Sequence, residues 1–237
     1  MVYGWLAKAS RRLYPPYCLL CSQPSRSARE LCNDCARDLP WNRHACPRCA
    51  LPLPAESGPQ LCGQCLKSPP VWDSAEAPLL YDWPLDQLLQ RFKFQGDLAT
   101  GQLLGESLAE FLAASSAARP EVLIPVPLHS ARLRERGFNQ AWELARPVSR
   151  RLHLRLDNRA CLRRKNTAVQ SKLDARERRR NLRDAFEVRT SLQGVHVGIL
   201  DDVVTTGATV AAISRALRDA GAARITVWSL ARAARPA

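Results

Sequence analysis

Four stretches beyond residue 77 place apolar residues at the three- and four-residue spacing of a helix. Such spacing lines one face of a helix with apolar side chains, which pack against a core. The third stretch contains Pro147, which we expect to kink or shorten its helix. The fourth stops at Gly221, a residue favoured just after a helix end. The four predicted helices cover residues 85–94, 103–118, 138–152 and 208–220.

Three short runs, two between these stretches and one after the last, have the length and the apolar content of buried strands. They cover residues 121–128, 195–200 and 224–230. Strands that alternate with helices are usually joined by crossovers and lie parallel to one another. The pattern therefore predicts an α/β fold with a largely parallel, Rossmann-like sheet.

The composition narrows the class of protein. Of the 237 residues 46% are hydrophobic, so the chain can bury a core. Its apolar runs fall short of the roughly 18 residues of a membrane-spanning helix. Lys8, Arg11 and Arg12 interrupt the stretch that a signal peptide would occupy. We therefore expect a protein that is neither secreted nor membrane-spanning. The formal net charge of +13 favours polyanionic partners such as nucleic acid, phosphorylated metabolites or an anionic membrane face.

Eight of the nine cysteines form four Cys-x-x-Cys pairs near the N-terminus. This spacing lets two thiolates meet one tetrahedral zinc ion at about 2.3 Å each, and two four-cysteine sites use all eight thiols. Redox dithiols or a disulfide knot are the alternatives, but zinc in a reducing compartment explains the whole pattern at once. The candidate ligands are Cys18, Cys21, Cys32, Cys35, Cys46, Cys49, Cys62 and Cys65. Cys161 stands alone and is expected to be a small buried residue.

The spacing leaves open how these ligands divide between two ions. Consecutive ribbons would put the first four cysteines on one ion and the last four on the other, whereas a cross-brace would interleave them. The short loops favour the consecutive arrangement, because closing a shorter loop costs less entropy. Ser68-Pro69-Pro70 is typical of a linker. We therefore predict a double zinc-ribbon domain over residues 1–70 and an α/β domain over residues 71–237.

The turn after the predicted strand 195–200 carries the most informative chemistry. Asp201 and Asp202 follow this strand at the carboxyl edge of the sheet, where open α/β sheets bind ligands. Such a pair suits sugar hydroxyls or a hydrated Mg²⁺. The next helix begins with N–H groups and a dipole that favour a phosphate, and Gly207 lets the backbone approach it closely. The residues of this turn are Thr205, Thr206, Gly207, Ala208 and Thr209.

Several motifs resemble those of a known family. The stretch Ile-Leu-Asp-Asp-Val-Val-Thr-Thr-Gly-Ala-Thr at 199–209 looks like the phosphoribosyl pyrophosphate (PRPP) signature of type I phosphoribosyltransferases. Pro-Val-Pro-Leu at 125–128, followed by Arg-Gly-Phe-Asn-Gln at 136–140, is similar to the most distinctive block of the ComF (competence protein F, GntX-like) family. The other similar blocks are Arg163-x-x-x-Thr167-x-x-Gln170, Arg178-x-x-Asn181-x-x-x-Ala185-Phe186, and Leu89-x-x-Phe-Lys93-Phe-x-Gly96. With the four cysteine pairs, which match the family's double zinc ribbon, the resemblance spans nearly the whole chain.

The resemblance implies a type I phosphoribosyltransferase-like domain that binds PRPP with Mg²⁺. It implies that Asp201 and Asp202 contact the ribose 2′ and 3′ hydroxyls and that residues 205–209 bind the 5′-phosphate. The loop after the first long strand, residues 127–139, is expected to handle pyrophosphate, because the planar guanidinium of arginine binds phosphate oxygens in pairs. The arginines available there are Arg132, Arg134 and Arg136.

Catalysis is less fully specified than binding. Residues 163–181 are the candidate lid that closes over the ribose and excludes water. Arg136, Arg163 and Lys165 are the candidate catalytic residues. Purine salvage transferases of this fold commonly carry an acid just before the Thr-Gly of the phosphate turn, where this chain has Thr205. His129 is the one titratable candidate for a base near a predicted loop. The alternative is an ordinary surface residue, which is the more common role of a lone histidine.

Positive charge is concentrated in one quarter of the chain. Residues 129–189 hold 18 Lys and Arg against seven Asp and Glu, a net charge of +11. One PRPP needs only a few positive groups, whereas a groove that follows single-stranded DNA would use the surplus. The candidate DNA contacts are Arg178, Arg179 and Arg180. The alternatives for this segment are a lid over PRPP and an ordinary solvated surface.

Two functions follow from these observations. The first is a cytoplasmic protein of natural transformation, in which the ComF family is implicated, that binds PRPP–Mg²⁺ and single-stranded DNA. Such a protein would work with the DNA-uptake machinery, at the periphery of the inner membrane. The second is an active phosphoribosyltransferase of nucleotide metabolism that transfers ribose 5-phosphate to an acceptor the sequence does not identify.

Overall fold

The centre of the fold is a six-stranded sheet in which every pair of strands is parallel. The computed structural model describes residues 16–25, 27, 29–55, 58, 60–165 and 185–234. The strand order is β1-β8-β7-β3-β4, and β2 also pairs with β8. The strands are β1 Ser74–Glu76, β2 Leu79–Leu80, β3 Val122–Pro125, β4 Arg155–Leu156, β7 His196–Val204 and β8 Arg224–Arg232. The predicted α/β fold with a parallel sheet is thus confirmed.

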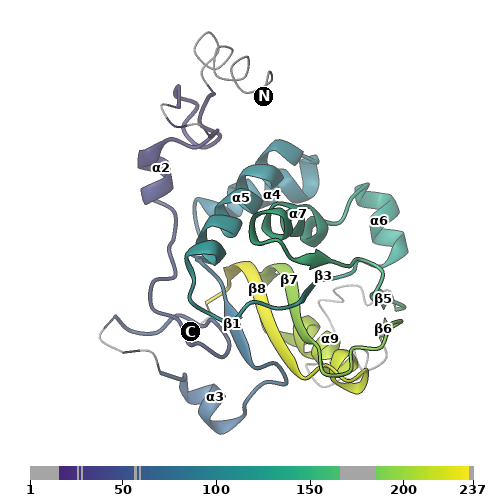
Figure 1. The fold of residues 1–237 in the computed structure, drawn as a ribbon. Coiled ribbons are helices and arrows are strands. Elements are labelled where there is room, and N and C mark those ends of the chain that lie inside the picture. The colour runs from purple at the N-terminus through teal and green to yellow at the C-terminus, as the bar shows by residue number, and fades with distance from the viewer. Residues whose placement is uncertain are drawn as a thin grey trace, which may run out of the picture.

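Helices cover both faces of this sheet (Figure 1). One face carries α4 (Leu85–Gln95), α5 (Leu98–Ala114) and α7 (Gln140–Leu152), and the other carries α9 (Ala208–Asp219). The helix α7 continues through Pro147 to Leu152. It approaches α5 closely because Gly105 has no side chain: a Cβ atom there would lie 2.5 Å from the Cγ of Pro147. The side chains of Phe92, Leu108, Leu144, Ile199 and Trp228 fill the core between the layers.

Several element boundaries differ from the sequence prediction. Helix α5 ends at Ala114 and not at residue 118, and β3 covers only Val122–Pro125 of the predicted strand 121–128. Two further differences have identifiable reasons. Helix α5 begins five residues earlier than expected, because Asp97 caps it by accepting a hydrogen bond from the N–H of Thr100 at 3.0 Å. Strand β7 continues to Val204, because β8 extends alongside it as far as Arg232. As a consequence, Asp201 and Asp202 lie within β7 and not after it.

Two segments that were expected to be loops contain regular structure. Helix α6 (Ser130–Arg136) occupies most of the predicted loop 127–139. The ring of His129 accepts a hydrogen bond from the N–H of Ala131 at its start, and Gly137 ends it at a φ of 82°. Strand β5 (Cys161–Arg163) pairs with β6 (Phe186–Val188) in a small antiparallel sheet, so the predicted lid starts from a strand.

The N-terminal part contains two short helices, α2 (Asn33–Arg37) and α3 (Gly63–Lys67), each with a cysteine as its N-cap residue. The second half of this part packs directly on the sheet, where the N–H of Ala75 in β1 donates to the carbonyl of Pro47 at 3.0 Å. The domain boundary at residue 70 stays a prediction. Among the described helices, none has the length and apolar character needed to cross a membrane.

Candidate functional site

The sheet has a switch point between β3 and β7. These strands are neighbours, yet the chain leaves them in opposite directions: α7 leads from β3 to β4, and α9 leads from β7 to β8. The two helices lie on opposite faces of the sheet (Figure 1). Ligands of open α/β sheets bind at such a point, outside the carboxyl ends of the strands.

Two acids stand at this point. The ladder between β3 and β7 ends at Pro125 and Leu200, so β7 pairs only with β8 from Asp201 onward. The carboxylate of Asp201 accepts a hydrogen bond from the N–H of Asp202 at 2.9 Å. The carboxylate of Asp202 lies 2.6 Å from the Nζ of Lys93, which comes from α4. The side chains of Lys93 and Asp202 are only 19% and 16% exposed, so this ion pair is largely shielded from water.

The acids and the arginines around them influence one another. Burial, together with the charge and the hydrogen bonding of Asp202, raises the pKa of Asp201 well above its usual range, although Lys93 acts in the opposite direction. Burial and the charge of Arg132 lower the pKa of Arg163, whereas the charge of Asp201 raises it. Arg163 is thus within electrostatic reach of both Arg132 and Asp201. A bound cation or hydroxyl donors would stabilise the carboxylate form of an acid in this environment.

The predicted phosphate turn follows directly. Thr205 and Thr206 are exposed, and the hydroxyl of Thr206 accepts a hydrogen bond from the N–H of Ala208 at 3.3 Å. Gly207 is the N-cap of α9 at a φ of 76°, and it offers no side-chain cap to the helix. The first turn of α9 therefore presents the kind of backbone that binds an anion.

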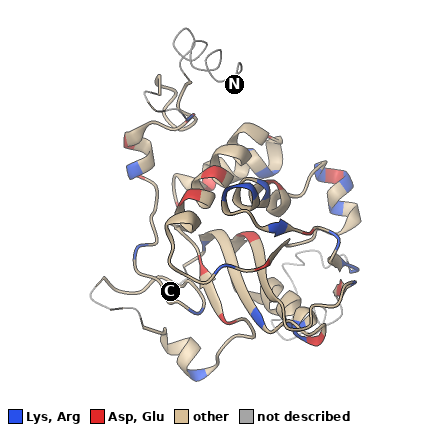
Figure 2. Cartoon of the chain, in the orientation of Figure 1, with Lys and Arg blue, Asp and Glu red and all other residues tan. Residues whose placement is uncertain are grey.

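The structure distributes the other predicted residues around this edge. The guanidinium of Arg136 lies over the ring of Phe94, 5.4 Å from its centroid, and Phe94 adjoins Lys93. Arg163 lies over Phe186 at 5.6 Å. Lys165 is exposed near β5. Basic residues of α6 and of β5 lie on one side of the molecule (Figure 2). Arg178, Arg179, Arg180 and the greater part of the candidate lid, residues 166–181, lie outside the described residues.

Two residues of the site were not assigned to it from the sequence. Lys93 lies in the block 89–96, which resembles a motif of the ComF family. That resemblance was the signal in the sequence that could have assigned Lys93 to the site. Trp72 lies beside the phosphate turn, because a Cβ atom on Gly207 would be only 3.1 Å from its ring. No spacing or motif marks Trp72 in the sequence.

The eight paired cysteines form two clusters, the first four in chain order and the last four. In each cluster the four Sγ atoms lie within 4.8 Å of one another. A tetrahedral ion with Zn–S bonds of about 2.3 Å requires S···S distances of about 3.8 Å. The Sγ atoms of Cys21 and Cys32 are 3.8 Å apart, and those of Cys49 and Cys62 are 3.6 Å apart. Both donor sets therefore fit a structural zinc ion. The first cluster is Cys18, Cys21, Cys32 and Cys35, and the second is Cys46, Cys49, Cys62 and Cys65.

In each cluster, hydrogen bonds lower the pKa of one thiol. Although burial opposes it, hydrogen bonds from backbone N–H groups lower the pKa of Cys18 to about 6. Against the same opposition, the N–H of Cys65 and the neighbouring thiols lower the pKa of Cys62 to about 7. Cys161 is buried, as expected, and burial raises its pKa to about 12.

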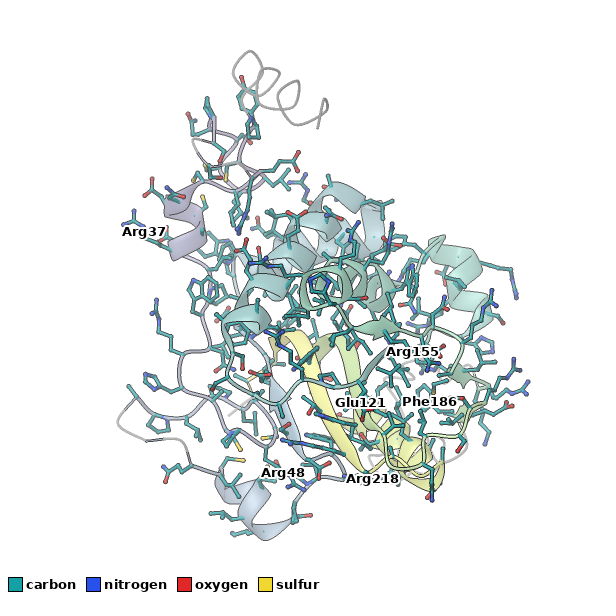
Figure 3. The ribbon with its side chains drawn as sticks, in the orientation of Figure 1. Arg37, Arg48, Glu121, Arg155, Phe186 and Arg218 are labelled. Atoms are coloured by element: carbon teal, nitrogen blue, oxygen red, sulfur yellow. The ribbon has the colours of Figure 1, made fainter. Side chains whose placement is uncertain are left out.

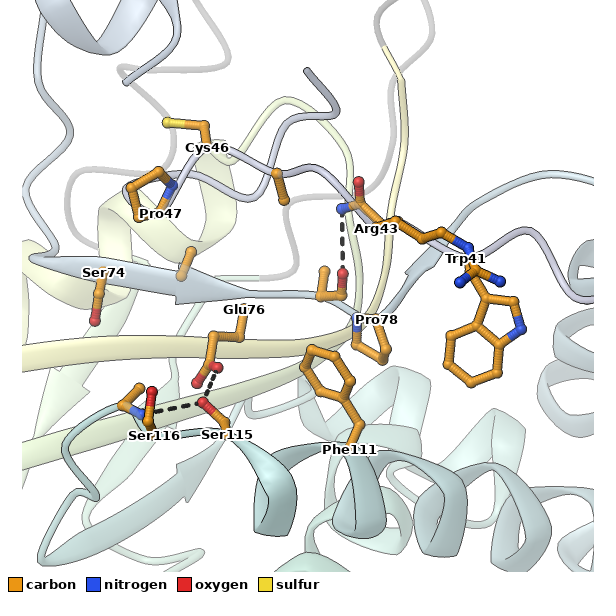
Figure 4. Close-up of a pocket in the computed structure, with 15 residues that line it drawn as sticks. Trp41, Arg43, Cys46, Pro47, Ser74, Glu76, Pro78, Phe111, Ser115 and Ser116 are labelled. Atoms are coloured by element: carbon orange, nitrogen blue, oxygen red, sulfur yellow. Dashed lines mark hydrogen bonds between the residues drawn. The ribbon is translucent and has the colours of Figure 1, made fainter. Parts of the chain in front are cut away.

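A separate cavity of about 600 Å³ lies between residues 41–47, strand β1 and the end of α5 (Figure 4). Its lining includes Trp41, Arg43, Phe111 and Glu76 but none of the residues of the switch point. The carboxylate of Glu76 accepts hydrogen bonds from the Ser115 hydroxyl at 2.5 Å and from the Trp228 indole at 2.9 Å. Glu76 is the one acid among the residues that line this cavity, which therefore lacks the adjacent acid pair of the carboxyl edge.

Known proteins are similar in sequence to both the cysteine-rich part and the α/β part of the chain. Residues 9–66 match the model of the double zinc ribbon domain. The chain is 38% identical over 223 residues to the DNA utilization protein YhgH of Escherichia coli (strain K12), covering 92% of this chain and 97% of that protein. It is 42% identical over 183 residues to competence protein F of Haemophilus influenzae, covering 73% and 79% of the two chains. Competence protein ComFC of Bacillus subtilis is 30% identical over 199 residues, covering 80% and 78%.

Solved structures were also found to be similar. A glutamine PRPP amidotransferase from B. subtilis, complexed with ADP and GMP, aligns with a TM-score of 0.40 and 19% identity. The alignment covers 55% of this chain and 26% of that one. A hypoxanthine phosphoribosyltransferase from Staphylococcus aureus aligns with a TM-score of 0.32 and 13% identity, covering 54% and 61%.

Proposed function

The chain belongs to the competence protein F (ComF) family, and from that premise we propose that it is a protein of DNA uptake that binds PRPP–Mg²⁺ and single-stranded DNA. Its relatives include a competence protein F, a ComFC and a DNA utilization protein. We propose that it acts in the cytoplasm, at the inner face of the membrane through which DNA enters.

One observation carries the PRPP part of the proposal. Two adjacent acids and a glycine-containing helix start meet at the switch point of a parallel sheet. The acids accept hydrogen bonds from vicinal ribose hydroxyls or hold a hydrated Mg²⁺, while residues 205–209 bind the 5′-phosphate through backbone N–H groups. Arg163, which interacts electrostatically with Arg132 and with Asp201, would face the pyrophosphate together with Arg132.

Lys93 supplies a positive charge beside the acid pair. Its ammonium group lies 2.6 Å from Asp202 and balances part of the negative charge of the acid pair. When Mg²⁺ or the ribose hydroxyls take over Asp202, Lys93 is released toward the phosphates of PRPP. The positive charge then stays within the site, where it favours the polyanion.

The charge distribution supports the DNA part of the proposal. Residues 129–189 carry a net charge of +11, and the described members of this set include arginines of α6 and of β5. Arg178, Arg179 and Arg180 would extend this positive surface along a DNA backbone. Because phosphate contacts release counterions, such binding is independent of sequence and weakens as salt rises.

Calorimetry with PRPP and Mg²⁺ tests the nucleotide part. We expect Asp201→Asn with Asp202→Asn to weaken binding at least roughly tenfold, since a hydrogen bond to a charged group contributes about 1.5–3 kcal/mol. The matched control is Asp219→Asn with Asp38→Asn, which removes the same charge from exposed positions. Equal affinity in the two double variants would contradict the proposal.

A turnover assay separates the binding protein from an active transferase. Isotope-labelled PRPP is incubated with the protein and a panel of nucleobases, with and without single-stranded DNA. We expect PRPP to be bound and to remain intact with each base. Release of pyrophosphate that requires one base would instead identify a phosphoribosyltransferase and its acceptor.

A further inference from the structure

A buried arginine joins the second cysteine cluster to the phosphate turn. Arg232, the last residue of β8, is 5% exposed. Its Nε donates to the carbonyl of Cys49 at 3.0 Å. Its Nη1 donates to the carbonyl of Val204 at 2.7 Å and to that of Thr205. One side chain thus holds a zinc-ligand residue and the first residue of the phosphate turn in a fixed relation.

Trp72 makes a second connection between the same two places. Its indole N–H donates to the carbonyl of Arg48 at 2.7 Å, and the ring lies against Gly207. Trp72 is itself buried, and Arg48 is labelled on the second ribbon in Figure 3. Residues 48 and 49 therefore contact the phosphate turn through two different side chains.

Both connections depend on how two carbonyl groups are oriented. Arg48 and Cys49 belong to the Cys46-Pro-Arg-Cys49 knuckle, whose shape is set when the two thiolates share one metal ion. Structural zinc contributes folding free energy directly, so the knuckle loosens when the metal leaves. Arg232 and Trp72 would then lose acceptors inside the protein, where an unsatisfied donor is costly.

The first cluster has different neighbours. Around it, Arg91 of α4 donates to the carbonyl of Leu19 at 2.9 Å, and Arg29 forms an ion pair with Glu110 of α5. These contacts reach the helices on one face of the sheet and not the phosphate turn. The two clusters, alike in chemistry, are therefore coupled to different parts of the fold.

We propose that Arg232 and Trp72 are positioning residues that make the geometry of the phosphate turn depend on metal at the second cysteine cluster and not at the first. The inference rests on the proposed function for the identity of the ligand, PRPP. Since coupling between two sites is reciprocal, PRPP binding also strengthens metal retention at the second cluster.

Hydrogen–deuterium exchange of the full chain tests the coupling without any ligand. Cys62→Ser and Cys32→Ser remove the equivalent third cysteine of the two clusters. We expect Cys62→Ser to speed exchange of the amides in residues 204–210 about tenfold or more and Cys32→Ser to leave them unchanged. Equal effects of the two variants on these amides would overturn the inference.

A second pair of variants keeps all eight cysteines. Trp72→Phe loses the bond to Arg48, whereas the control Trp228→Phe loses a comparable indole bond to Glu76 from an equally buried site. With two zinc ions still bound, we expect Trp72→Phe to weaken binding of PRPP–Mg²⁺ about threefold to tenfold, because it loses one hydrogen bond and the part of the indole ring that lies against Gly207. We expect no weakening in Trp228→Phe.

The outcomes separate the two proposals. If the wild-type protein binds no PRPP, the proposed function fails, while the exchange comparison still decides the coupling. If PRPP binds, but Trp72→Phe and Trp228→Phe weaken it equally, the positioning role is contradicted. Retention of zinc gives a further readout: added PRPP should slow chelator-driven release of one ion in the wild-type protein, and it should not do so in Trp72→Phe.

Discussion

Replacing Lys93 with methionine probes the charge balance of the proposed site. The change keeps an unbranched apolar side chain, one atom shorter, and removes the ammonium group 2.6 Å from Asp202. Exposed ion pairs contribute about 0–1 kcal/mol, whereas removing one partner of a buried pair costs about 3–5 kcal/mol. With side chains 19% and 16% exposed, this pair lies between the two cases, so we expect a loss of about 2 kcal/mol.

Thermal denaturation measures this loss. For a protein of this size, about 2 kcal/mol corresponds to a fall in Tm of about 4–8 °C. The exposed Lys67 provides the control, and Lys67→Met should leave Tm nearly unchanged. Adding Asp202→Asn to Lys93→Met removes the uncompensated charge and should restore part of the loss, which a double-mutant cycle quantifies. An unchanged Tm in Lys93→Met, or strictly additive effects, would refute the idea that the two side chains stabilise each other.

Three further predictions concern metal, DNA and the fold. Elemental analysis should find two zinc ions per chain and one in Cys32→Ser; a folded protein without zinc would contradict the double ribbon. Replacing Arg178, Arg179 and Arg180 with alanine should weaken single-stranded DNA binding for all sequences and flatten its log–log salt slope by about 0.7 per lost contact. If instead PRPP binding collapses and the slope stays constant, the segment is a lid. Asp97→Ala should cost about 1 kcal/mol by removing the cap of α5.

The cap at Asp97 also predicts a pH dependence. Burial opposes it, but hydrogen bonds from Thr100 and the charge of Arg91 lower the pKa of Asp97. Because the folded pKa is the lower one, this contribution is present above the unfolded pKa of about 3.9 and is lost as pH falls through the folded value. Urea unfolding between pH 6 and pH 3 should therefore show a steeper loss of stability in the wild-type protein than in Asp97→Ala.

Local sequence signals were sufficient to predict those features that depend only on residues close together in the chain. The apolar spacing of α4 and α9 and the Cys-x-x-Cys pairs each report on a few neighbouring residues, and the structure has these elements where they were expected. The acid pair and the phosphate turn were likewise predicted from one continuous motif, and their role in binding stays a prediction.

Long-range contacts account for what the sequence did not predict. Strand β7 is longer than its apolar run because β8 pairs with it, and β1 has only three residues and depends on β8 for its pairing. Lys93 meets Asp202 across more than one hundred residues of chain, and Arg232 meets Cys49 across a still longer separation. Such contacts leave no periodic pattern, because each is a single side chain placed by the packing of distant elements.

A crystal structure of the zinc-loaded protein with PRPP and Mg²⁺ tests the central claim most directly. We predict the 5′-phosphate at the backbone N–H groups of residues 206–209 and the ribose hydroxyls or the metal at Asp201 and Asp202. Lys93 should have left Asp202 for the phosphates. Binding of PRPP at the cavity beside Glu76, or an empty carboxyl edge at saturating PRPP, would contradict the account.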